Sequence, residues 1–61
     1  MSLTYKNYFI RYRIEDGKVV VTSAIADWNF TCSNGGETFD SVDDLKRAID
    51  NGLWAIGRGK W

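Results

Sequence analysis

Three carboxylates lie close together at the start of a predicted helix, where they could bind a ligand or a partner. Asp40, Asp43 and Asp44 fall within five residues, and such a group could hold a cation or imitate phosphates toward a basic partner. The spacing is not that of a calcium loop, which needs a later bidentate acid. Each position also suits a helix start, where acids stabilise the positive end of the helix dipole. We expect a capped helix start on a solvated face, with binding of a partner as the functional alternative.

Other side chains that run reactions near neutral pH are scarce. The chain has 61 residues, no His and one Cys. To act as a nucleophile, Cys32 would need a neighbouring base such as His. Its place in an apolar alternation with Phe30 favours a buried structural thiol. One Cys without His also excludes an ordinary zinc site and an intrachain disulfide. We expect no enzyme activity, no metal and no cofactor.

A second candidate surface alternates aromatic and basic residues. Phe9, Arg11 and Arg13 occur at every other position, so a strand places them on one face. Arginine beside an aromatic ring on an open sheet can hold single-stranded nucleic acid by stacking and charge. The plain alternative is a polar face on which the arginine stems cover apolar atoms.

The C-terminal residues are a third candidate surface. Trp54, Arg58, Lys60 and Trp61 put two indoles and two cations among glycines. Such an arm could insert into a nucleic acid or into a groove on a protein. Alternatively, Trp54 closes the core while Trp61 packs back or frays. We expect residues 57–61 to form a flexible tail.

These candidates must be positioned by a β-hairpin over residues 5–14 and 18–26. The first run alternates with period two, the second is rich in β-branched side chains, and Asp16-Gly17 between them is a strong hairpin signal. A two-residue type I′ turn gives these pairs: Glu15 with Lys18, Ile14 with Val19, Arg13 with Val20, Tyr12 with Val21, and Tyr8 with Ile25. A bulge at Gly17 would instead put Arg13 beside Val19. We prefer the first register because it separates apolar from charged residues better.

Further strands and one helix follow the hairpin. Residues 27–33 alternate and predict a third strand, and residues 37–39 are either a short fourth strand or the end of a hairpin with the third. Ser41 is a good N-cap with Asp44 three residues on. Apolar side chains recur at helical spacing and Gly52 suits the end, which predicts a helix over residues 42–51.

The resulting fold class is α+β, with residues 1–61 as a single domain. A three- or four-stranded antiparallel sheet packs on one C-terminal helix, βββα or ββββα. We expect the helix, with Phe39 and Leu53, to cover one sheet face: Tyr8, Ile10, Tyr12, Val19, Val21 and Ile25. Residues 53–56 suit either a helical turn or a returning strand. An edge strand and exposed aromatics would permit a homodimer.

The charge balance separates two classes of partner. Eight Lys and Arg balance eight Asp and Glu, whereas a typical nucleic-acid-binding domain is strongly basic. The sequence has no apolar run near the roughly 20 residues of a membrane span and no signal-peptide pattern. With its lone thiol, the chain is expected to be cytoplasmic, with no membrane partner.

Residues 37–50, ETFDSVDDLKRAID, resemble the ending of many small phage and prophage proteins. In those proteins short strands lead into an F-D-S-x-x-x-L/A-K-x-x-I-D helix. The layout is also similar to that of some phage-encoded inhibitors of CRISPR complexes and to the HicB antitoxin fold, although the Pro- and Gly-rich third-strand signature of HicB is missing here. The resemblance implies a sheet-plus-helix fold and carries over no functional residue.

We therefore expect a small non-enzymatic binding protein of phage or mobile-element type. It would act by contact with a larger protein, for example as an inhibitor of a host complex. The alternative function is that of a nucleic-acid-binding accessory protein.

Overall fold

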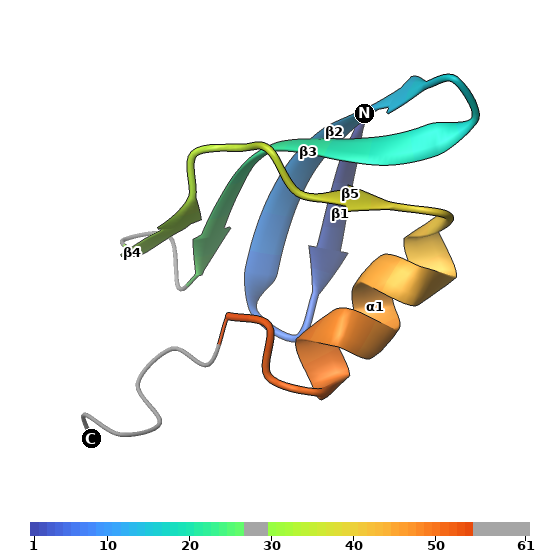
Figure 1. The fold of residues 1–61 in the computed structure, drawn as a ribbon. Helices are drawn as coiled ribbons and strands as arrows, with labels where there is room; N and C mark the ends of the chain where they lie inside the picture. The colour runs from blue at the N-terminus through green and yellow to red at the C-terminus, as the bar shows by residue number, and fades with distance from the viewer. Residues whose placement is uncertain (27–29, 55–61) are drawn as a thin grey trace.

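Five antiparallel strands and one helix make up residues 1–26 and 30–54, the part of the chain that the computed structural model describes. The elements, in chain order, are β1 (Ser2–Tyr5), β2 (Tyr8–Glu15), β3 (Lys18–Ala26), β4 (Phe30–Ser33), β5 (Thr38–Phe39) and α1 (Val42–Asp50). The helix lies along one face of the sheet (Figure 1). The expected α+β layout, an antiparallel sheet with one C-terminal helix, is confirmed.

The chain opens with a hairpin that was not expected. Lys6 and Asn7 have φ of 47° and 71°, and this two-residue turn joins β1 to β2 with Tyr5 opposite Tyr8. The single strand predicted over residues 5–14 is therefore wrong at its beginning. Asn tolerates positive φ better than most residues, but Lys-Asn is a much weaker turn signal than Asp-Gly, and the alternation of apolar side chains runs on around it.

The second hairpin confirms the preferred register near its turn. Asp16 and Gly17 have φ of 54° and 75°, and the predicted pairs hold from Glu15–Lys18 as far as Tyr12–Val21. The register then shifts between Arg11 and Tyr12, because Thr22 is an extra residue in β3. The expected pair of Tyr8 with Ile25 is therefore wrong, since Tyr8 lies opposite Ala26.

The bulge at Thr22 decides which side chains of β3 enter the core. A bulge adds one residue to one strand, so the inward alternation moves from odd to even positions. The inward side chains of β3 are accordingly Val19, Val21, Ala24 and Ala26, all buried. Ile25, expected in the core, faces the opposite side of the sheet.

Both β4 and β5 pair with the same edge of β3. Ala24 and Ala26 lie opposite Ser33 and Phe30 of β4, whereas Val19 lies opposite Phe39 of β5. The predicted fourth strand therefore forms, and it pairs with β3 rather than as a hairpin with β4. Only residues 30–33 of the predicted strand 27–33 are described, and they form β4.

The connection from β4 to β5 runs along the edge of β3 beside the bulge. The Val21 N–H donates to the Glu37 carbonyl at 2.8 Å, and the Gly36 N–H donates to the Val21 carbonyl at 3.0 Å. The buried Ser33 hydroxyl donates to Glu37 Oε1 at 2.6 Å and accepts from the Gly35 N–H at 2.9 Å. This connection ties the two short strands to one edge.

The helix begins as its caps predict. The Ser41 hydroxyl accepts from the Asp44 N–H at 3.2 Å, and at the other end Gly52 has φ of 93° and donates to the Ile49 carbonyl at 3.0 Å. The helix ends at Asp50, one residue earlier than predicted. The chain continues as a turn through Trp54, so the described part of residues 53–56 is neither helix nor strand.

The core lies between α1 and the inner face of the sheet. Leu45 and Ile10 are fully buried there. The inward side chains of β3 and Ile49 are also buried. Leu53, expected in the core, is 39% exposed, whereas Trp54 is only 8% exposed. The Trp54 indole lies 5.8 Å from the Tyr8 ring, and the Tyr8 hydroxyl donates to the Trp54 carbonyl. Trp54 thus closes one end of the core.

Candidate functional site

The sheet face opposite α1 carries a row of side chains across four strands. Directly paired residues share a face, and the register links Thr4 to Phe9, Phe9 to Ile25, and Ile25 to Thr31. We call these four residues the outer row. Phe9 and Ile25 at its centre are half-buried, and Thr4 and Thr31 at its ends are exposed. The row therefore presents an apolar centre between hydroxyl-bearing ends.

Two arginines lie on the same face as the outer row. Regular alternation along β2 puts Arg11 and Arg13 on the side of Phe9, as predicted. Arg13 Nε lies 3.5 Å from Glu15 Oε2, and both side chains are largely exposed. Arg11 is exposed and forms no ion pair within residues 1–26 and 30–54. Over the part of the chain that the structure describes, the face thus combines an apolar centre with a cation that has no ion-pair partner.

A small recess adjoins the outer row at the β1–β2 turn. It has a volume of about 100 Å³ and is lined by Thr4, Asn7, Tyr8 and Phe9. Aromatic residues and arginine are enriched at protein interfaces, and their anchors fill recesses of this kind. The recess could take one small side chain of a partner.

The predicted acidic cluster is divided among structural contacts. Asp40 Oδ1 accepts from Lys18 Nζ at 2.7 Å, and Asp44 Oδ1 accepts from Arg47 at 2.8 Å. The hydrogen bond and positive charge of Lys18 lower the pKa of Asp40, and the same contact raises the pKa of Lys18. Asp43 is exposed in the first turn of α1. The cluster therefore mainly stabilises the helix start.

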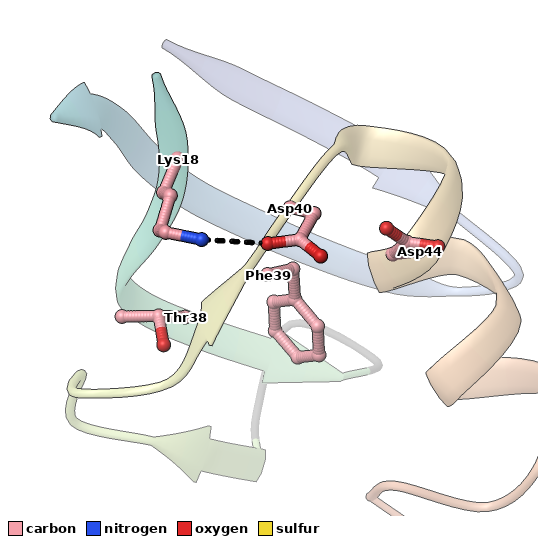
Figure 2. A pocket seen from close by; sticks show the side chains of 5 residues that line it. All are labelled: Lys18, Thr38, Phe39, Asp40 and Asp44. Carbon is pink, nitrogen blue, oxygen red and sulfur yellow. Dashed lines mark hydrogen bonds and ion pairs between the residues drawn. The ribbon is translucent and has the colours of Figure 1, made fainter. Parts of the chain in front are cut away.

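A shallow hollow opens beside this helix start (Figure 2). It has a volume of about 400 Å³, and its lining comes from β3, β5 and α1: Lys18, Thr38, Phe39, Asp40 and Asp44. The Lys18–Asp40 pair spans it, with the Asp44 carboxylate to one side. The single cation is already matched by a carboxylate, and the lining offers no nucleophile with an adjacent base. The lining of this hollow suits weak polar contact with a partner.

Sequence reasoning missed a polar contact between α1 and the first turn. The Tyr5 hydroxyl donates to Asp50 at 3.0 Å, and Lys6 forms an ion pair with the same carboxylate. Hydrogen bonds from Lys6 and Tyr5 lower the pKa of Asp50, and the hydrogen bond to Asp50 raises the pKa of Lys6. Lys46 lies 5.5 Å from the centre of the Tyr5 ring. Neither a motif nor spacing signals this contact, because it depends on the unexpected turn at Lys6.

The remaining candidates are placed as follows. Trp54 belongs to the core, so a partner could reach little of it. Arg58 and Trp61 lie outside the described residues. Cys32 is half-buried, and its thiol contacts the Phe30 carbonyl at 3.8 Å. Within residues 1–26 and 30–54, no three acidic or thiol side chains gather as a metal site would require.

Comparisons with protein families, curated proteins and solved structures found no match to this chain. In the described part of the chain, α1 has nine residues, too few to cross a membrane.

Proposed function

We propose that this chain is a non-enzymatic binding protein whose outer sheet face contacts a larger protein. The observation that carries the proposal is the outer row, an apolar centre of Phe9 and Ile25 on the same face as Arg11, which has no ion pair among the described residues. Aromatic side chains and arginine are enriched at protein interfaces, and arginine is frequent among the residues that supply most of the binding energy. The hollow beside the helix start is polar and its Lys18 is already paired with Asp40, which makes it a poorer candidate for binding a partner.

Inhibition of a host complex is the form of this function that the resemblance to small phage proteins favours. An inhibitor needs only to occupy a surface, and a sheet face with an apolar centre suits that task. The paired strands β1, β2, β3 and β4 hold the row in place, which reduces the entropy lost on binding.

Charge reversal at Arg11 tests the proposal. Tagged wild-type protein, Arg11→Glu and the control Arg47→Glu are used to capture proteins from a host lysate, and each captured protein is then titrated against all three. Arg47 lies on α1, away from the outer row, so the control makes the same change elsewhere. We expect Arg11→Glu to weaken binding at least about tenfold, roughly 1.4 kcal/mol. Equal affinity for all three proteins would contradict the proposal.

Nucleic-acid binding is the second candidate, because Arg11 and Arg13 lie on the same sheet face as Phe9. Balanced charge and the Arg13–Glu15 contact weigh against it. Titration of a fluorescent single-stranded oligonucleotide at rising salt tests this function. Phosphate contacts would make affinity fall steeply with salt, and absence of binding at low salt would eliminate it.

A further inference from the structure

Strand β1 forms one edge of the sheet, and its outward backbone groups follow a defined pattern. β1 ends the strand order, and no strand within the described residues pairs with its far side. Met1 and Tyr12 exchange both of their backbone hydrogen bonds, each at 2.9 Å. Along an antiparallel ladder, narrow pairs, whose two residues exchange both backbone hydrogen bonds, alternate with wide pairs, whose residues form no hydrogen bond to each other. The N–H and C=O groups of Ser2 and Thr4, which belong to wide pairs with β2, therefore point away from the sheet.

This edge lacks three features by which proteins prevent pairing between edge strands. Those features are proline, charged side chains and bulges. The chain contains no proline, and Ser2–Tyr5 contains no charged side chain. The pairing of β1 with β2 is also regular throughout. β1 is thus open to an added strand.

We propose that β1 pairs antiparallel with β1 of a second copy, about a two-fold axis at Leu3. This register sets Ser2 of each copy opposite Thr4 of the other as narrow pairs. Both outward donors and both outward acceptors of each copy are then used, which makes four intermolecular hydrogen bonds. Displacement by two residues keeps only the two bonds of a Ser2–Ser2 or Thr4–Thr4 pair, and displacement by one residue aligns outward groups with inward ones. One register is therefore favoured.

The side chains of β1 also match themselves in this register. The two Leu3 residues form a wide pair on the inner face, where Cα atoms lie about 4.5 Å apart and side chains are close. Leu3 already packs against the core cluster, so the pair would extend the core from one copy to the other. On the outer face, serine and threonine hydroxyls meet and no like charges oppose. A foreign strand could share the backbone bonds, but the self-matching side chains favour a second copy.

Sedimentation equilibrium of wild type, Thr4→Pro and Thr4→Val tests this pairing. Thr4 lies in a wide pair with Phe9, so proline there removes an outward donor without breaking a bond to β2. We expect wild type and Thr4→Val to reach twice the 7.0 kDa chain mass at millimolar concentration, and Thr4→Pro to stay monomeric with an unchanged far-ultraviolet circular dichroism spectrum. A monomeric wild type, or a folded Thr4→Pro that dimerises equally, would overturn the proposal.

A second measurement on the unaltered chain decides the question if Thr4→Pro does not fold. In a dimer assembled from differently isotope-labelled copies, the wide pair predicts an intermolecular Hα–Hα Overhauser effect between the two Leu3 residues. The amide protons of Ser2 and Thr4 should also become protected from exchange as concentration rises. A dimer without the Leu3 contact would refute this edge. None of these outcomes depends on the partner proposed for the outer row.

Discussion

The approach of Gly35 to the bulge in β3 allows a sharp prediction for substitution by alanine. A Cβ atom at Gly35 would lie 2.7 Å from the Thr22 carbonyl oxygen, a backbone atom that cannot turn aside. The φ of Gly35 is +109°, a conformation that alanine rarely adopts. Gly36 has a similar φ of +114°, but a Cβ there would meet nothing within 4 Å. The two glycines thus share the backbone strain and differ in the collision.

The expected magnitudes follow from these two contributions. Strained φ costs about 1–3 kcal/mol at either glycine, and overpacking adds about 1–3 kcal/mol at Gly35 alone. A 61-residue chain has a total stability of roughly 3–9 kcal/mol. Gly35→Ala therefore removes a large share of that stability, and Gly36→Ala a smaller one.

Urea denaturation followed by tryptophan fluorescence measures both losses. We expect Gly35→Ala to lose at least about 1 kcal/mol more than Gly36→Ala, which corresponds to a difference in Tm of roughly 4–8 °C. Equal losses in the two variants would show that the connection from β4 to β5 does not press against β3 at Thr22. That result would refute the close approach of Gly35 to the Thr22 carbonyl as a cause of the loss.

Two further predictions concern the ends of α1. Ser41→Ala should lower the free energy of unfolding by about 1 kcal/mol, because it leaves the Asp44 N–H without its acceptor. Ser41→Asp supplies another acceptor, so thermal melts should show most of the wild-type stability. If Ser41→Asp loses as much stability as Ser41→Ala, the capping explanation is excluded. Because the pKa of Asp50 is lowered in the folded state, its contribution is present above the unfolded pKa of about 3.9 and lost as pH falls through the folded value. Melting temperatures measured from neutral to acidic pH should therefore fall less steeply in Asp50→Asn than in wild type, and parallel curves would show that the contact with Lys6 and Tyr5 is not linked to folding.

Local signals of the sequence predicted the elements that depend on local chemistry. Asp16-Gly17 specified the second hairpin and its first four pairs, and the Ser41 cap with Gly52 delimited the helix to within one residue. Both rest on backbone conformations that particular residue types favour wherever they occur. The turn at Lys6-Asn7 and the bulge at Thr22 lack such chemistry. Both are held by pairing between strands, which a single sequence does not display.

The candidate site was predictable to the same extent. Arg11 and Arg13 share a face with Phe9 because alternation along β2 is unbroken. Ile25 was placed on the wrong face because one extra residue in β3 reverses the alternation beyond it. Thr31 could not be assigned to the outer row without the pairing of β3 with β4, and Lys18 could not be paired with Asp40 without that of β3 with β5.

The position of β3 between β2 on one side and both β4 and β5 on the other makes the chain hard to divide. A fragment that stops before residue 38 leaves the part of β3 that pairs with β5 without a neighbour, and it lacks the helix that covers the apolar face of the sheet. The complementary fragment, which starts at residue 38, keeps β5 and α1 but has no sheet to pack against. Neither half should hold its shape alone, yet mixing the two should regenerate the whole. This would make the chain a natural basis for a split reporter, in which signal appears only when both pieces are brought together.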